Sequence, residues 1–404
     1  MSLPWANLPG GNALHAWDFL TNEARWNGVS VGGPANTPNW TVTRASTGYA
    51  QTSGGVLQSF ASGELRRTDK GVLIEGAGTN LCLQSQTFDN ASWTKTEATI
   101  SADAVAAPDG TTTADKLVES SNTAAHNVRQ SIAVTSGTAY TFSVYAKAAE
   151  RTKVSIYGSG GMAHTARVDL STGTVETGTA TVTALANGWY RIALTATASA
   201  TGSANFWTEL YNGAGSYAGN GTSGIYLWGA QLEATAYASS YIPTTTGSAT
   251  RAADSLTVTG VTGLAYPVSL FVEFERGVDT GAFEHLLTTH AGDSNHASLY
   301  VNSSDQGGGT TRQGGAAQAS VAVTGALAVG TVYKVAMRVT TNDVQAAQGG
   351  TLATADTSCT NPPTPNTITF GNVQNGGNPC YGYLRRLAIF SRALSDAELR
   401  ALTT

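Results

Sequence analysis

Three alternating residues in the stretch NFWTELY could contact a sugar. Trp207, Glu209 and Tyr211 are spaced two residues apart, and side chains at that spacing point to the same side of a β-strand. Flat rings pack on the C–H faces of pyranose sugars, and carboxylates accept hydrogen bonds from sugar hydroxyls. These residue types predict a carbohydrate-binding face. The competing interpretation is a hydrophobic core, where aromatic residues of β-sandwiches more often lie.

A second aromatic pair occurs in GIYLWGAQLE. Strict alternation places Tyr226, Trp228, Ala230 and Leu232 on one face of a strand. The opposite face is apolar as well, so each face needs a cover. We add Tyr226 to the carbohydrate-binding candidates and expect Trp228 to contact a neighbouring domain.

Catalytic groups are few. Glu209 and Glu233 lie on candidate neighbouring strands and could act as acid and base on a glycosidic bond, but carboxylates that only bind sugars look the same. FEHLLTTH, residues 283–290, lacks the H-E-x-x-H spacing of a zinc site and predicts a strand with a polar end. We expect a binding protein rather than an enzyme.

The composition favours an all-β protein. The 404 residues include 46 glycines and only 12% charged residues, in short alternating segments bounded by turn residues. The net charge of −5 without a basic stripe argues against nucleic acid as a partner. No apolar run reaches the roughly 18 residues of a membrane span. The start, MSLPWANLPGG, does not have the pattern of a signal peptide.

The three cysteines do not have metal-site spacing. Cys82 is expected to be a buried small apolar residue. Cys359 and Cys380 bracket a loop and could form a disulfide outside a cell, whereas cytosolic assembly would keep them reduced. The sequence leaves both states open.

The chain divides into three predicted regions. Residues 1–80 are rich in tryptophan but irregular, residues 81–245 contain strands at sandwich-like spacing, and residues 246–404 repeat that pattern after the predicted linker YIPTTTGSAT. A short helix, SDAELRALTT, closes the chain, with Ser395 as N-cap and Glu398 completing a capping box.

Longer stretches resemble known families. TVTRASTGYAQTSGGVLQSFASGELRRTDKGVLIEGAGTNL resembles the N-terminal module of many phage and prophage structural proteins. The segments QSQTFDNASW, YTFSVYAKA, NGWYRIALT and YLWGAQLEATAYASSYIPT resemble the head-spike fibre domain of phages and gene transfer agents, which also occurs in tail fibres. These two resemblances cover about residues 41–254. The ending GYLRRLAIFSRALSDAELRALTT is similar to concanavalin A-like (laminin G-type) lectin domains.

The resemblance implies tandem β-sandwiches, a carbohydrate-binding-module-like jelly roll followed by a concanavalin A-like sandwich, behind an irregular N-terminal anchor. It implies a virion-borne receptor-binding spike or fibre that attaches a phage-like particle to the capsular or other surface polysaccharide of a host bacterium. Further partners would be virion proteins at the capsid vertex or fibre base, and a homo-oligomer is compatible with this role. The protein would be assembled in the bacterial cytoplasm and end on the particle surface, with residues 1–80 as the attachment region.

The resemblance also raises the question of a structural calcium ion, because many jelly-roll binding modules bind one. Phe88 and Asp89 match the acidic position of the first strand. Where the last strand of such modules carries Asp, this chain has Trp228 and Gly229. Calcium therefore stays open, with Asp89 as the candidate ligand, and no other cofactor is expected.

Two other functions remain as alternatives. An architectural protein that decorates a capsid or joins a fibre to it would show no saturable sugar binding. A polysaccharide-degrading enzyme would release reducing ends.

Overall fold

A computed structural model describes residues 13–373 and 377–404. Trp5, one of the tryptophans of the predicted attachment region, lies outside the described residues. The described chain is all-β apart from short 3-10 turns and one C-terminal helix, which confirms the predicted fold class. None of its helices is both long and apolar enough to span a bilayer. The contacts divide the chain into two compact units, which are described separately below.

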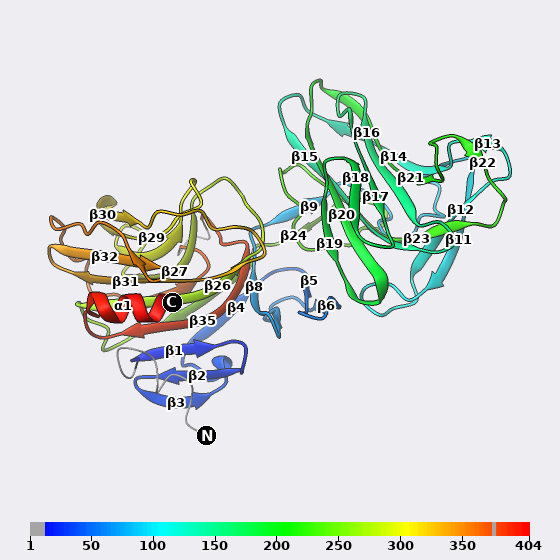
Figure 1. The fold of residues 1–404 in the computed structure, drawn as a ribbon. Coiled ribbons are helices and arrows are strands. Elements are labelled where there is room, and N and C mark those ends of the chain that lie inside the picture. Colours follow the sequence, from blue (N-terminus) through cyan, green and yellow to red (C-terminus); the bar gives the residue numbers. More distant parts are fainter. Residues whose placement is uncertain (1–12, 374–376) are drawn as a thin grey trace. The chain divides into compact units, whose positions relative to one another are not determined.

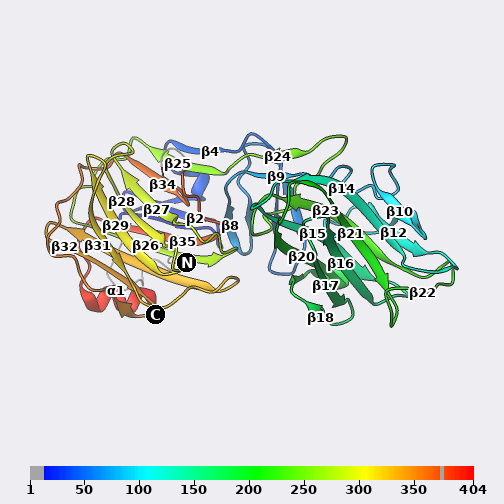
Figure 2. The same ribbon diagram turned by 90° about the horizontal axis from the view of Figure 1, so that it is seen from above.

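Unit 1 consists of residues 1–46, 60–77 and 252–404. It contains two antiparallel sheets that enclose one apolar core (Figure 2). The larger sheet contains β1 (His15–Asp18), β2 (Glu23–Trp26), β3 (Val29–Gly32), β7 (Arg67–Thr68), β8 (Gly71–Ile74), β26 (Val268–Arg276), β31 (Val332–Thr340), β32 (Asp343–Gln348), β33 (Thr351–Leu352) and β35 (Gly382–Phe390). The smaller sheet runs in the order β30 (Ala316–Ala322), β29 (Gly307–Gln313), β28 (His296–Val301), β27 (Glu284–His290), β34 (Thr367–Phe370), β25 (Ser255–Thr259) and β4 (Trp40–Thr43).

The C-terminal helix α1 (Asp396–Thr403) covers the outer side of the larger sheet of unit 1 (Figure 1). The Ser395 side chain accepts a hydrogen bond from the Glu398 backbone N–H, and the Glu398 carboxylate accepts one from the Ser395 N–H. Leu394 and Leu399 lie in the same buried cluster. The predicted helix and its capping box are therefore confirmed.

Unit 2 consists of residues 47–59 and 78–251. Two six-stranded antiparallel sheets enclose its core. One contains β10 (Thr94–Thr96), β14 (Asn127–Val134), β21 (Gly202–Tyr211), β16 (Lys153–Ser159), β17 (His164–Asp169) and β18 (Thr174–Gly178). The other contains β11 (Ala98–Val105), β12 (Ala114–Glu119), β23 (Gly224–Glu233), β15 (Ala139–Ala148), β20 (Trp189–Thr197) and β19 (Thr181–Ala184). Short pairs complete the described strands: β5 (Gly48–Gln51) with β6 (Leu57–Phe60), β9 (Gly78–Asn80) with β24 (Ala249–Arg251), and β13 (Thr123–Ala124) with β22 (Tyr217–Ala218).

A β-bulge interrupts the predicted alternation of β23. Trp228 lies opposite Tyr145 of β15, but the next pair joins Gln231 to Ser143, so β23 holds one residue more than β15 between these pairs. Gly229 sits in the bulge with φ +61°. Ala230 and Leu232 consequently point into the core between the sheets rather than to the side of Trp228, as strict alternation had predicted.

The outer side of β23 is covered by the chain's own N-terminal part. Trp228 is fully buried in a cluster with Tyr49 and Leu57, which come from β5 and β6, and with Tyr145 and Tyr241. The Trp228 indole N–H donates a hydrogen bond to Thr113 Oγ1 at 3.0 Å. The cover is therefore a hairpin within unit 2 rather than a separate domain.

Residues 13–80 do not form a separate irregular region. Strand β1 pairs with β35, with Trp17 opposite Leu387, and β4 pairs with β25. The predicted boundary near residue 80 therefore differs from the observed division, which assigns residues 47–59 to unit 2 and residues 13–46 and 60–77 to unit 1. Such pairing partners leave no local sequence signal because they lie far away along the chain.

A buried ionic cluster joins the separate segments of unit 1. The Asp254 carboxylate accepts a hydrogen bond from Arg44 at 3.1 Å and also pairs with Arg66. Arg66 donates a second hydrogen bond to Glu75 at 2.7 Å. Three chain segments thus meet in one fully hydrogen-bonded charge network, which is the condition for burying charges without a large penalty.

The predicted linker is in part ordered structure. Tyr241, Ile242 and Thr244 are buried, and the Thr244 backbone N–H donates a hydrogen bond to Ser85 Oγ at 2.8 Å. Residues 245–248 are exposed. The crossing from unit 2 to unit 1 then lies between residues 251 and 252.

Candidate functional site

The predicted sugar-contact residues lie on the outer face of a unit 2 sheet. Trp207, Glu209 and Tyr211 share one side of β21, while their neighbours Phe206 and Leu210 point into the core. The flanking strands add residues to the same side, because Tyr157 of β16 and Arg129 of β14 both lie opposite Trp207. We call this set, together with Asn127, Ser155 and Arg167, the β21 face.

Ring contacts hold the aromatic side chains of the β21 face. Tyr157 and Trp207 stack with ring centroids 4.9 Å apart and an angle of 18° between the planes. The Arg167 guanidinium carbon lies 3.7 Å from the centre of the Tyr211 ring, a distance at which the cation is attracted by the ring face. Trp207 and Tyr157 therefore each have one ring face covered by the other, and their edges and remaining faces are left for a ligand.

Glu209 is the buried carboxylate of the β21 face. It accepts hydrogen bonds from the Tyr157 hydroxyl at 3.2 Å and the Asn127 amide at 3.4 Å. Burial raises the pKa of the Glu209 carboxyl above its usual range, and these hydrogen bonds oppose that shift. Glu209 thus fixes the Tyr157 ring in its stack on Trp207, besides offering acceptor lone pairs to a ligand.

The β21 face also carries a free cation. Arg129 is half-buried, and no hydrogen bond or ion pair joins its guanidinium to another residue in the described part of the chain. It flanks Trp207 on the side away from Tyr157. Ring edges, one carboxylate and guanidinium donors on a single face can bind a hydroxyl-rich ligand.

Tyr226 lies on the other sheet. β23 pairs with β12 and β15, and Tyr226 packs against the Trp228 cluster on the outer side of that sheet. The side chain is half-buried. It is therefore on the opposite side of the sandwich from Trp207, and the structure does not bring the four predicted residues together.

The structure separates the two carboxylates that the sequence offered as an alternative acid–base pair. Glu209 is on β21 and Glu233 on β23, which belong to different sheets. Glu233 is 1% exposed and accepts hydrogen bonds from Ser239 and Gln231, so the two carboxylates cannot flank one glycosidic bond.

Residues 28–32, GVSVG, match the G-x-S-x-G pattern of a nucleophile elbow. Ser30, however, is exposed in strand β3 and does not lie at a strand-to-helix turn.

The candidate calcium ligand does not gather a donor set. Asp89 is exposed, and its backbone carbonyl accepts a hydrogen bond from Lys95. The nearby Asp115 carboxylate already accepts the backbone N–H groups of Phe88 and Asp103. Within residues 13–373 and 377–404, no group of three or more His, Cys, Asp or Glu side chains is placed to hold a metal ion.

The cysteines are free thiols. Cys359 lies against the hairpin that joins β31 to β32, where its backbone oxygen accepts a hydrogen bond from Asn342. Cys380 follows β34 of the smaller sheet, where its N–H donates to Gly371. The predicted alternative of a Cys359–Cys380 disulfide is not formed, because the two residues are held against different elements. Cys82 is buried, as expected.

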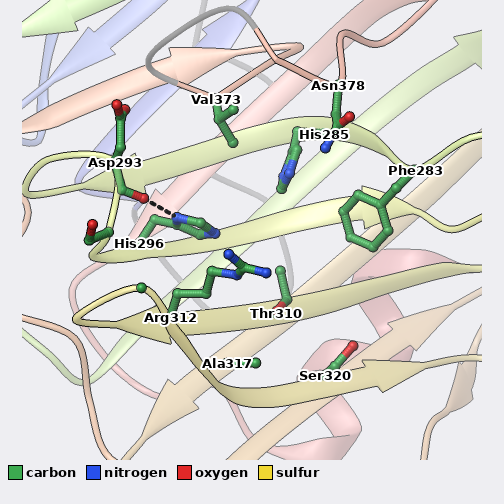
Figure 3. A pocket seen from close by; sticks show the side chains of 12 residues that line it. Phe283, His285, Asp293, His296, Thr310, Arg312, Ala317, Ser320, Val373 and Asn378 are labelled. Carbon is green, nitrogen blue, oxygen red and sulfur yellow. Dashed lines mark hydrogen bonds between the residues drawn. The ribbon is translucent and has the colours of Figure 1, made fainter.

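Unit 1 contains a pocket on the outer side of its smaller sheet (Figure 3). Its volume is about 470 Å³, within the range of roughly 300 to 1,000 Å³ typical of ligand sites. Strands β27, β28, β29 and β30 supply half of its lining residues, and segments outside these strands supply the other half. The lining side chains that could contact a ligand are Phe283, His285, His296, Thr310, Arg312 and Ser320.

Two histidines of this pocket are neutral. Burial lowers the pKa of His285 to about 3, and the neighbouring His296 and Arg312 add to the shift. Burial also lowers the pKa of His296 below its usual value. The two rings are 5.9 Å apart and perpendicular, so they can act as hydrogen-bonding groups without charge.

The sequence interpretation missed this pocket. FEHLLTTH was expected to be a strand with a polar end. The strand is confirmed as β27, and its polar residues are buried along with the rest of it. Alternation along β28 offered a signal, because His296, Ser298 and Tyr300 share the side opposite to the core residues Ala297 and Leu299. The pairing of β27, β28 and β29, which brings Arg312 to the histidines, leaves no such signal.

The chain was compared with protein families, curated proteins and solved structures. Residues 253–400 match the family model described as the concanavalin A-like lectin/glucanases superfamily. No curated protein matches the chain. Solved structures with similarity include the Ruminococcus gnavus IT-sialidase CBM40 (18% identity, 34% of this chain and 83% of that chain, TM-score 0.29). Others are a heptameric SAP-like pentraxin from Limulus polyphemus (11%, 33% and 68%, TM-score 0.27) and the NanB sialidase of Streptococcus pneumoniae (16%, 35% and 24%, TM-score 0.29).

The family match and the observed sandwich indicate the same fold. The sequence of the closing strand and helix led to the same expectation. Residues 253–400, which supply the pocket, are a concanavalin A-like lectin/glucanase domain.

Proposed function

We propose that this protein binds carbohydrate, and that it does so as the receptor-binding spike or fibre of a phage-like particle that attaches to bacterial surface polysaccharide. The β21 face is the proposed contact surface. A lectin-like fold in unit 1 is compatible with this function but does not by itself assign it.

The observation that carries the proposal is the grouping of Trp207, Tyr157 and Glu209 on an outer sheet face. Aromatic residues with core roles in this unit, such as Trp189 and Trp228, are fully buried. Trp207 and Tyr157 remain half-buried although their rings are stacked. Ordered, partly exposed rings next to a carboxylate and to guanidinium groups suit sugar C–H surfaces and hydroxyls together.

Binding of capsular polysaccharide to the full chain tests this proposal. Trp207→Ala should weaken binding roughly tenfold or more, since ring contacts supply about 0.5–1.5 kcal/mol beyond their buried area. The fold should survive because the ring is on the outer face. Tyr226→Ala is the matched control, a half-buried aromatic residue on the other sheet, and should leave binding unchanged.

Two results would contradict the proposal. Absence of saturable binding to any bacterial surface polysaccharide would favour the architectural alternative. Equal loss of binding in the Trp207→Ala and Tyr226→Ala proteins would show that the β21 face is not the binding surface.

The particle-borne role and the absence of enzymatic activity belong to the same proposal. The particle-borne role is supported by the sequence resemblance of about residues 41–254 to phage structural proteins. Attachment to the particle by residues 1–80 stays a prediction. Incubation of polysaccharide with the full chain should release no reducing ends, and release that disappears in a Glu209→Gln variant would instead identify a hydrolase.

A further inference from the structure

The unit 1 pocket contains a guanidinium with no partner. Arg312 is exposed and lines the pocket, and its guanidinium has no hydrogen bond or ion pair to any residue the structure describes. Figure 3 shows its side chain reaching into the same space as His285, His296 and Phe283. A free guanidinium in a concave site matches a carboxylate, which it can bind through two parallel hydrogen bonds.

His296 offers a lone pair to this space. Its Nδ1 lies 3.2 Å from the Asp293 carbonyl oxygen. A carbonyl only accepts, so Nδ1 carries the proton, and Nε2 of the neutral ring has a lone pair. His296 is 6% exposed, and Nε2 is buried without a partner among the described residues. A buried polar atom without a partner is costly unless a ligand or water satisfies it.

A chain of hydroxyl groups allows His285 to take the same tautomer. Its Nδ1 lies 2.7 Å from Ser298 Oγ. The other neighbours of Ser298 Oγ are the Leu287 and Leu299 carbonyls and the Thr288 hydroxyl. The carbonyls only accept, and Thr288 donates its own proton to the Asn372 carbonyl. When the Ser298 hydroxyl donates to the Leu287 carbonyl, His285 donates from Nδ1 to Ser298 Oγ and has its lone pair on Nε2.

We propose that this pocket is a second ligand site, which takes a hydroxylated carboxylate such as a uronic acid residue of an acidic polysaccharide. Arg312 binds the carboxylate, and the two imidazole Nε2 atoms accept hydrogen bonds from hydroxyl groups. The Phe283 ring, 5.0 Å from the His285 ring, provides an apolar wall for the C–H surface of the sugar.

The same chemistry argues against two other ligands. A phosphate dianion has acceptor oxygens and few donors, so it would meet the two lone pairs unfavourably, and one arginine would balance only half of its charge. Imidazoles that donate from Nδ1 are also suited to a metal ion. However, no third metal ligand joins the two histidines among the described residues, and the Arg312 charge opposes a bound cation.

Calorimetric titration of the full chain with sodium glucuronate tests the inference. Glucuronate should bind with millimolar to micromolar affinity, glucose at least tenfold more weakly, and inorganic phosphate should not compete. Arg312→Gln should lower glucuronate affinity roughly tenfold or more, because a charge-assisted hydrogen bond is lost. Arg312→Lys keeps the charge without the planar fork and should lose less.

The variants remain interpretable because Arg312 is exposed and has no partner to lose in the described structure. Lys147→Gln, on strand β15 of unit 2 and outside both proposed sites, is the charge-matched control and should bind glucuronate like the unmodified chain. The inference is overturned if glucuronate does not bind, if binding survives Arg312→Gln unchanged, or if phosphate displaces glucuronate. None of these results depends on the Trp207 experiment, so this site and the β21 face can fail independently.

Discussion

Individual buried side chains set the pH at which unit 1 is stable. His15 is 0% exposed and His285 is 5% exposed. Burial lowers the pKa of His15 to about 4 and that of His285 to about 3. Both imidazoles are therefore neutral in the folded protein at pH values where the unfolded chain would already protonate them.

The first prediction is a loss of stability in mild acid that depends on His285. Between pH 6.5 and about 3 the unfolded chain binds a proton at this position and the folded chain does not. The contribution of His285 to the free energy of unfolding should be fully present above pH 6.5. Below that pH it should fall by about 1.4 kcal/mol per pH unit. Denaturant unfolding at pH 6.5, 5.5 and 4.5 measures the slope.

His285→Asn provides the comparison, because an amide can still donate to Ser298 but does not titrate. The variant should have a shallower pH dependence than the unmodified chain. Contributions from Glu284, whose pKa is raised by burial, and from His15 are common to both proteins and cancel in the difference. Parallel pH profiles would show that His285 is protonated equally in the folded and unfolded states.

At the scale of single elements, local alternation predicted strands wherever a strand has one core face. The segments that became β21 and β23 were identified in this way. Trp207, Glu209 and Tyr211 were correctly placed on one face for the same reason. Tyr157 and Arg167 were not included, since strand pairing brings them to β21, and pairing over 40 to 50 residues leaves no mark in the pattern.

The bulge in β23 shows where alternation fails. One added residue at Gly229 reverses the side to which all following residues point. An isolated glycine inside a strand is itself a signal for a bulge, which strict alternation does not take into account. The backbone conformation at φ +61°, which glycine adopts without strain, is the physical reason for its presence.

The second prediction concerns this bulge. In a Gly229→Ala variant the added Cβ would lie 2.8 Å from Tyr145 Cδ2, and the Tyr145 ring is buried between Trp228 and Tyr241. Gly221→Ala is a matched control, because Gly221 also has positive φ (+78°) but no atom within 4 Å of the added Cβ. The control should lose about 1–2 kcal/mol from backbone strain, and Gly229→Ala should lose clearly more. If thermal unfolding shows the same loss of stability for both variants, the aromatic side chains around Gly229 can move to accommodate the methyl group.

At the scale of the whole molecule, the chain enters and leaves each unit more than once. It passes between the units after residues 46, 59, 77 and 251. The sequence suggested consecutive regions because the long strand-rich segments are consecutive. The small segments that complete each unit, residues 47–59 and 60–77, are too short to show their assignment in composition or periodicity.

The third prediction follows from this threading. A fragment of residues 47–251 contains all of unit 2, whereas a fragment of residues 78–251 lacks Tyr49 and Leu57 and exposes the ring cluster around Trp228. The shorter fragment should be less stable by about 3–6 kcal/mol, from the burial of two large apolar side chains. Near-ultraviolet circular dichroism and thermal melting compare the two. Identical melting would mean that the β5–β6 hairpin contributes nothing to the fold.

The pairing of β1 with β35 has a consequence during protein synthesis. Trp17 has its partner Leu387 about 370 residues later in the chain, so the larger sheet of unit 1 cannot close until the ribosome has made residue 387. At roughly 5–20 residues per second, β1 must wait for about 20 to 75 seconds. Unit 2 is complete once residue 251 has left the ribosomal tunnel and can fold first. The nascent N-terminal strands, with their apolar side chains, are meanwhile exposed to chaperones and to premature association with other copies.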